Sequence, residues 1–109
     1  MNASLQAWLA LFAAGAFEIG WPLGFKLSQT TPHRLAWIVV AIACMAISGA
    51  LLWLAQRTIP IGTAYAVWTG IGAAGTFAIG VLFFGDAATA GRMVGALLIV
   101  AGVVLLRIA

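Results

Sequence analysis

Charged side chains are scarce in this chain of 109 residues. Only 6% of them are Asp, Glu, Lys or Arg, and 65% are hydrophobic, whereas a soluble domain has about 25% charged residues. The single cysteine, Cys44, excludes an intramolecular disulfide and argues against a thiolate metal cluster. The five basic residues are scattered at the ends of apolar segments, without the basic patch that nucleic-acid binding requires. The composition therefore predicts an integral membrane protein with no nucleic-acid partner.

The apolar residues fall into segments of membrane-spanning length. About 20 residues cross the hydrocarbon core as a helix, and four segments approach this length: 5–25, 35–55, 61–84 and 87–106. Long segments of alternating polarity are absent, so helices rather than a barrel must satisfy the backbone hydrogen bonds. The connections, 26–34, 56–60 and Gly85-Asp86, are too short for a soluble domain. We predict an all-α membrane protein with one four-helix transmembrane domain over residues 1–109.

Glu18 is the only ionisable side chain between Leu5 and Phe25. A carboxylate within a membrane helix is costly to bury, so such a residue is by default a candidate functional site. The other acidic residue, Asp86, lies in a polar break between two apolar segments. Glu18 is therefore the expected place for a proton or a cation.

Several polar and aromatic residues are expected on helix faces near Glu18. Residues three or four apart share a face of a helix, which places Gly15 and Trp21 beside Glu18. The third segment carries Tyr65 and Trp68 on one face, and the second contributes a lone hydroxyl, Ser48. An acid surrounded by aromatic rings and hydrogen-bond donors suits a small organic cation, because aromatic faces attract cations.

The basic residues give almost no orientation signal. With four spans, Arg57 and Arg107 lie on one side of the membrane, and Lys26, Arg34 and Arg92 on the other. The positive-inside rule depends on such a difference, so the chain can insert both ways and form an antiparallel dimer. Gly95 and Gly102 share one face of the fourth segment, where small residues let membrane helices approach closely. We expect a dimer contact on this face.

Three stretches resemble the small multidrug resistance family over essentially the full length of the chain. They are AAGAFEIGWPLGFKLS at 13–28, IPIGTAYAVWTGIGAAG at 59–75 and GALLIVAG at 95–102. Trp21, three residues after the glutamate, and WTGIG at 68–72 resemble the guanidinium exporter subtype; the polyaromatic-cation exporters usually have Gly at the first position. Pro22 stands where the subtype commonly has Ala, which leaves open which substituted guanidiniums are accepted.

This resemblance implies an antiparallel, dual-topology homodimer in the bacterial inner membrane. It also implies that Glu18, from both subunits, is the shared proton and substrate site. The implied roles of the other matching residues are to orient that glutamate (Ser48 and Trp68), to line the pocket (Gly15 and Trp21), to act as a switch (Tyr65), and to form the dimerisation helix (Gly95 and Gly102).

The sequence therefore predicts a proton-coupled antiporter for guanidinium and small substituted guanidiniums such as guanylurea. Guanidinium is planar and its N–H groups can bind a carboxylate in a bidentate manner. Each Glu18 is expected to hold protons or substrate, but not both, while the dimer alternates between inward-open and outward-open states. Neither covalent chemistry nor a cofactor is needed, so an enzyme is not expected; the partners are the cation, protons, lipid and a second copy of the chain.

Other functions compete with this prediction. The nearest is an exporter of quaternary ammonium and polyaromatic cations. A small dual-topology channel of the fluoride type is a second, although an acid in the pathway would repel anions. A rotary-ring proton subunit also carries a buried carboxylate, but such subunits usually have two helices. A membrane assembly partner without transport activity is the last.

Overall fold

The computed structural model describes residues 2–109 and contains four α-helices within that range. Their bounds are α1 Ala3–Thr30, α2 Arg34–Gln56, α3 Ile61–Phe83 and α4 Ala90–Ile108. All four are long and apolar enough to cross a membrane. Because a membrane helix satisfies its own backbone hydrogen bonds, such apolar segments fold as helices in lipid. The predicted all-α class with four transmembrane helices is confirmed.

The first helix is longer than the apolar segment within it. At its start, the side-chain oxygen of Asn2 accepts a hydrogen bond of 2.7 Å from the N–H of Leu5, as an N-cap residue does. At its end, the hydroxyls of Thr30 and Thr31 donate to the carbonyls of Lys26 and Leu27 at 3.1 and 2.7 Å. The polar residues 26–30, expected in a loop, are therefore helical, because helix geometry does not require an apolar environment.

The connection between α3 and α4 is built around Gly85. This residue has a φ of +71°, a left-handed conformation that glycine adopts without steric cost and that commonly ends helices. The chain then turns back, and the N–H of Asp86 donates to the carbonyl of Gly80 at 3.0 Å. Helix α4 begins at Ala90, later than the expected residue 87, since Thr89 caps it by accepting a hydrogen bond of 3.3 Å from the N–H of Arg92.

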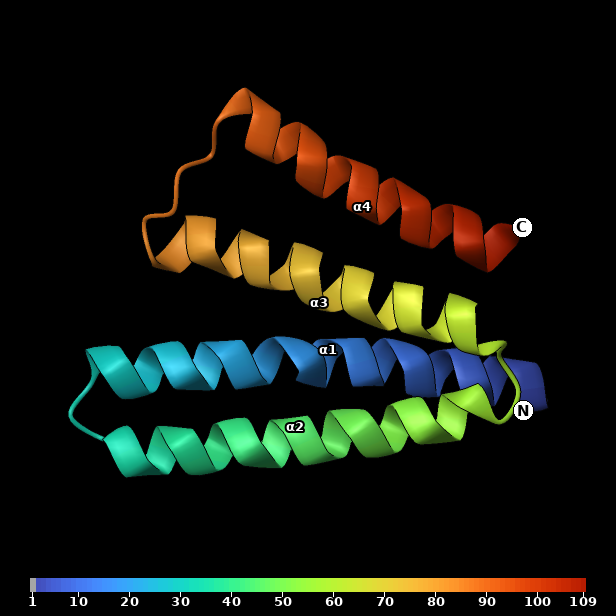
Figure 1. The fold of residues 1–109 in the computed structure, drawn as a ribbon, viewed down its shortest axis with the longest axis horizontal. Helices are drawn as coiled ribbons and strands as arrows, with labels where there is room; N and C mark the ends of the chain where they lie inside the picture. Colours follow the sequence, from blue (N-terminus) through green and yellow to red (C-terminus); the bar gives the residue numbers. More distant parts are fainter. Residues whose placement is uncertain (1) are drawn as a thin grey trace.

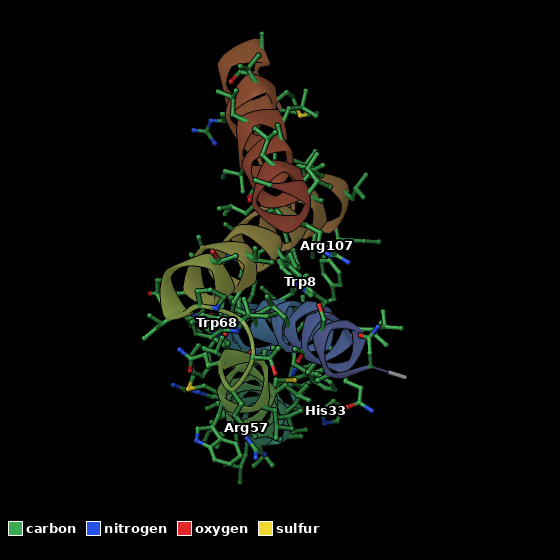
Figure 2. The ribbon with its side chains drawn as sticks, turned by 90° about the vertical axis from the view of Figure 1, so that its right-hand side faces the viewer. Trp8, His33, Arg57, Trp68 and Arg107 are labelled. Atoms are coloured by element: carbon green, nitrogen blue, oxygen red, sulfur yellow. The ribbon has the colours of Figure 1, made fainter. Side chains whose placement is uncertain are left out.

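The helices are arranged as an antiparallel sequence of neighbours (Figure 1). Helices α1 and α2 lie side by side with the most extensive contact, and α3 packs mainly against α1. Helix α4 contacts only α3 at the level of the backbone and lies on the far side of it from the α1–α2 pair (Figures 1 and 2). Both termini and the α2–α3 connection are at the same end of the molecule.

The buried core lies where the first three helices meet. Leu11 of α1 and Val67 of α3 are fully buried there, together with the small residues Ala55 and Ala64. Small residues allow membrane helices to pack closely. By contrast, no residue of α4 is buried. The structure therefore holds α1, α2 and α3 as one unit and leaves α4 with open apolar surface.

Side chains near one end tie α4 back to α1. The guanidinium carbon of Arg107 lies 4.8 Å from the centre of the Trp8 ring (Figure 2). At the same end, Arg57 lies 5.6 Å from the ring of Trp53, which is largely exposed. Both pairs have the geometry of cation–π contacts. Trp and Arg at a helix end also match the composition of a membrane interface.

Candidate functional site

Glu18 lies in the middle of α1 and faces α3. Its side chain is half-buried and packs on the backbone of Gly72, where an added Cβ would lie 2.7 Å from Cγ of Glu18. Glycine at this position is therefore a condition for the carboxylate to lie between the two helices. Of the polar face expected on the third segment, Trp68 donates a hydrogen bond to Ser48 and not to Glu18, and the residue of α3 that packs on Glu18 is Gly72.

One oxygen of the Glu18 carboxylate is held and the other is free. The indole N–H of Trp21 donates to Oε1 at 2.8 Å, because a residue three positions later shares the same face of the helix. Among residues 2–109, Oε2 accepts no hydrogen bond, and it is not a buried atom without a partner. Oε2 is therefore open to a ligand or a proton.

Ser48 of α2 connects the three packed helices. It is fully buried, accepts a hydrogen bond of 2.8 Å from the indole N–H of Trp68, and donates to the backbone carbonyl of Ala14 at 2.7 Å. Its Oγ is also 3.4 Å from Oε1 of Glu18, which is long for a hydroxyl hydrogen bond. A hydroxyl has only one hydrogen to donate, and here the short distance places it on Ala14.

Tyr65 and Gly15 do not surround the Glu18 carboxylate in the way that the sequence predicted. The ring of Tyr65 is half-exposed and its centre is 5.4 Å from that of Trp68, but within the described chain no hydrogen bond joins it to Glu18. At Gly15, an added Cβ would lie 2.7 Å from Ile71. The space beside Gly15 is thus filled by α3, and this glycine serves the close approach of α1 and α3.

A groove of about 370 Å³ opens beside Glu18. This volume is within the range of about 300–1,000 Å³ that is usual for small-ligand pockets. One wall is α1 and the other is α3, and the residue beyond them is Asp86 of the α3–α4 connection. The lining residues are Glu18, Trp21, Pro22, Thr69, Gly72, Ala73, Thr76, Phe77 and Asp86.

Several residues of the groove were not predicted from the sequence. Asp86, Thr76 and Phe77 line the same groove as Glu18, although the sequence places Asp86 in a polar break far along the chain. The acidity of Asp86 was a signal, since the chain has only two acidic residues. The acceptor role of the Ala14 carbonyl had no signal, because backbone groups do not appear in a sequence pattern.

The predicted dimer glycines are open within one chain. An added Cβ at Gly95 or at Gly102 would meet nothing within 4 Å. Both residues lie on α4, whose surface is exposed along its length. The role of these glycines in a dimer contact therefore stays a prediction.

The arrangement suits reversible binding of a small cation. Glu18 contributes a negative charge with one free oxygen, and Trp21 and Phe77 add aromatic rings to the walls. Among the described residues, no group of three His, Cys, Asp or Glu side chains comes together in the manner of a metal site. The groove has the chemistry of a cation-binding site.

Comparisons with known proteins place the chain among membrane transporters of one family. Residues 6–99 match the family described as Small Multidrug Resistance protein. The chain is 43% identical over 103 residues to a guanidinium exporter of Citrobacter freundii, which covers 94% of this chain and 97% of the relative. It is 42% identical over 104 residues to a guanidinium exporter of Yersinia pseudotuberculosis, with 95% and 99% covered.

Proposed function

This chain belongs to the small multidrug resistance family, and from that premise we propose that it exports guanidinium and small substituted guanidinium ions in exchange for protons. It is a multi-pass protein of the bacterial inner membrane. The observation that carries the proposal is the arrangement of the Glu18 carboxylate, whose Oε1 accepts a hydrogen bond of 2.8 Å from Trp21 while Oε2 stays free among the described residues. The names of the relatives supply the class of substrate.

The exchange follows from competition at one carboxylate. Trp21 fixes the orientation of Glu18 without occupying Oε2, so a proton or a cation can bind there. A guanidinium ion stays charged at physiological pH, and its N–H groups can bind both carboxylate oxygens, since each oxygen has two lone pairs. Protonation of Glu18 removes the negative charge and releases the cation. A proton gradient then drives export.

A second copy of the chain completes the transport pathway. Within one chain the groove beside Glu18 has helical walls from α1 and α3 only, and α4 carries exposed apolar surface that is available for assembly. We propose that two copies assemble in opposite orientations, so that both Glu18 residues face one chamber. Alternating exposure of this chamber to the two sides of the membrane moves the cation.

The proposal is tested by currents across proteoliposomes on a solid-supported membrane. Pulses of guanidinium and of guanylurea are applied to wild-type protein and to Glu18→Gln, with tetrapropylammonium as the comparison cation. The proposal expects currents for the guanidinium compounds that vanish in the variant. Guanidinium transport by Glu18→Gln against a proton gradient would overturn the exchange scheme. Currents for tetrapropylammonium alone would assign the chain to the multidrug type of exporter.

A further inference from the structure

Asp86 shares the groove of Glu18 although it belongs to a different element. Glu18 comes from the middle of α1 and Asp86 from the connection after α3, yet both line the same cavity of about 370 Å³. These two are the only acidic residues of the chain. Glu18 is half-buried and Asp86 is exposed, and both line the groove. A cation that enters from solvent therefore meets the exposed carboxylate first, and we call the Asp86 side the mouth of the groove.

The backbone holds Asp86 in this place. The left-handed Gly85 turns the chain back toward α3, and the N–H of Asp86 donates to the carbonyl of Gly80 at 3.0 Å. The carboxyl group then lies against Gly80, where an added Cβ would be 3.0 Å from Cγ of Asp86 and closer still to Oδ2. The Asp86 side chain fits in this position because residue 80 is glycine. Asp86 is thus positioned by the fold and is not merely part of a solvated loop.

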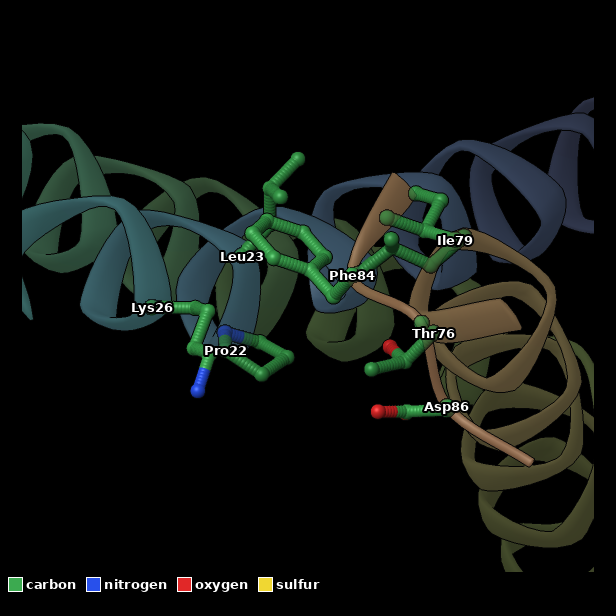
Figure 3. A pocket seen from close by; sticks show the side chains of 9 residues that line it. Pro22, Leu23, Lys26, Thr76, Ile79, Phe84 and Asp86 are labelled. Carbon is green, nitrogen blue, oxygen red and sulfur yellow. The ribbon is translucent and has the colours of Figure 1, made fainter. Parts of the chain in front are cut away.

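The charged neighbour of Asp86 is Lys26 of α1. Both residues line a second cavity of about 240 Å³ that adjoins the first through Pro22, Thr76 and Asp86. Figure 3 shows Lys26 and Asp86 facing the same opening from the α1 side and the α3 side, with Pro22 between them. Among the described residues, no salt bridge joins Lys26 and Asp86, although both line this cavity. The Asp86 carboxylate therefore remains able to attract a second cation.

We propose that Asp86 is a substrate-recruiting residue that binds the guanidinium-type cation at the mouth of the groove before it reaches Glu18. The proposal rests on the transport function given above and adds a second carboxylate to it. A cation at the mouth is attracted by Asp86 and repelled by Lys26, so it is directed to the Asp86 side and along the α3 wall. Charges that line a cleft raise the local concentration of an oppositely charged substrate and its rate of association.

The expected signature is a change in KM more than in the maximal rate. Asp86 is exposed and outside the exchange step, so its charge favours association and leaves the competition at Glu18 unaltered. Removing one unit charge at a few ångströms in water changes cation binding by about threefold. Salt screens such an exposed charge, so the difference should fade between about 0.01 M and 0.15 M ionic strength.

The test measures guanidinium currents from the intact protein in proteoliposomes, as a function of guanidinium concentration and of salt. The variants are Asp86→Asn, which removes the charge, Asp86→Glu, which keeps it, and Gly80→Ala, which keeps the charge but displaces the Asp86 carboxylate from its position against residue 80. His33→Asp is the matched control, because it adds an exposed charge at the same end of the molecule outside both cavities and leaves the basic residues unchanged. The proposal expects a KM about threefold higher for Asp86→Asn at low salt, a smaller rise for Gly80→Ala, and KM near wild type for Asp86→Glu and His33→Asp.

The outcomes separate this inference from the proposed function. Wild-type currents that depend on Glu18, together with an unchanged KM in Asp86→Asn, would overturn the role of Asp86 and leave the transport function standing. A fall in maximal rate at constant KM, or a rise in KM that is independent of salt, would also overturn it. A wild-type protein without guanidinium currents would overturn the proposed function and this inference with it.

Discussion

The two oxygens of the Glu18 carboxylate have different surroundings, and this difference is the basis of the site. Oε1 accepts the indole N–H of Trp21 at 2.8 Å, while Oε2 has no hydrogen-bond partner among the residues that the structure describes. In the proposed exchange, a carboxylate held in this way keeps its direction when a proton or a cation leaves. The orientation of the site therefore depends on one side chain of the same helix.

Trp21→Phe should weaken guanidinium transport without unfolding the protein. The substitution keeps an aromatic ring in the groove and removes the hydrogen bond to the charged carboxylate. Hydrogen bonds to charged groups contribute about 1.5–3 kcal/mol, and the groove is partly open, so a rise in KM of about tenfold is expected. Concentration series of guanidinium currents measure it.

The matched control for this change is Trp53→Phe. Trp53 is largely exposed and outside the groove, so its variant should keep the wild-type KM. If both Trp→Phe variants changed KM equally, the effect would come from membrane anchoring and not from the Trp21–Glu18 hydrogen bond.

Ser48→Ala should destabilise the packing of the first three helices. Ser48 is fully buried, and the change leaves the Trp68 indole N–H without its acceptor and removes the hydrogen bond to the Ala14 carbonyl. An unsatisfied buried polar group costs about 1–3 kcal/mol. We expect a lower midpoint of thermal unfolding in detergent for Ser48→Ala, and no shift for the exposed residue in Ser4→Ala. Equal midpoints for the two variants would mean that the Ser48 network contributes nothing to stability.

At the residue scale, the sequence predicted which polar side chains come together better than which atoms they contact. Glu18, Trp21 and Ser48 follow from polarity and spacing within apolar segments. That Ser48 donates to the Ala14 carbonyl at 2.7 Å instead of to Glu18 depends on the packing of α1 against α2, for which the sequence has no local signal.

The groove forms where helices α1 and α3 approach each other closely. Gly15 of α1 meets Ile71, and Gly72 of α3 meets Glu18, each with no room for a further carbon atom. Small residues on both helices thus set the distance between the walls. The position of the carboxylate is a property of the helix pair as much as of Glu18.

Gly72→Ala should abolish or strongly reduce transport. The new Cβ would lie 2.7 Å from Cγ of Glu18, a distance at which the glutamate side chain or α3 must move. Overpacking of this kind costs about 1–3 kcal/mol, and a displaced carboxylate loses its bond to Trp21. Glu18-dependent guanidinium currents are the measurement, with a loss of about tenfold or more expected.

Gly62→Ala provides the comparison on the same helix. An added Cβ at Gly62 would meet nothing within 4 Å, so this variant should transport within about twofold of wild type, as exposed substitutions usually do. Wild-type currents in Gly72→Ala would show that the fit between Glu18 and α3 is unimportant for transport.

The helix boundaries show that hydropathy predicts the presence of a helix better than its first and last residues. The apolar segments predicted the existence and type of all four helices, because lipid requires them. The pattern placed the end of the first helix near Phe25, whereas α1 continues to Thr30, since backbone hydrogen bonds and hydroxyl contacts continue beyond the apolar region. The start of α4 is set by the N-cap at Thr89, and hydropathy does not predict such a cap.

The whole molecule has two ends with nearly equal basic charge. Figure 1 places both termini and the α2–α3 connection at one end, which carries Arg57 and Arg107, and the other two connections at the opposite end. The second end carries Lys26, Arg34 and Arg92. Two against three is a weak orientation signal. Together with a groove whose walls come from only two helices, α1 and α3, this balance supports assembly of two oppositely oriented copies.

Variants with fixed orientation test this assembly directly. Gln29→Lys with Thr30→Lys adds two charges to the end with Lys26, while Ser4→Lys with Thr58→Lys and Arg34→Gln shifts the balance to the end with the termini. All five residues are exposed, so the fold should tolerate the changes. Because basic residues near helix ends determine orientation, each variant should insert in one direction only.

Each variant expressed alone should therefore fail to protect cells against guanidinium, and the two expressed together should restore protection to near the wild-type level. A cysteine at position 109 in a Cys44→Ala background reports orientation through labelling by an impermeant maleimide. Full activity of one variant alone, with labelling from one side only, would mean that the transporter works with parallel copies. Restoration only on co-expression would show that the transporter needs both orientations, because one copy supplies only the α1 and α3 walls of the groove beside Glu18.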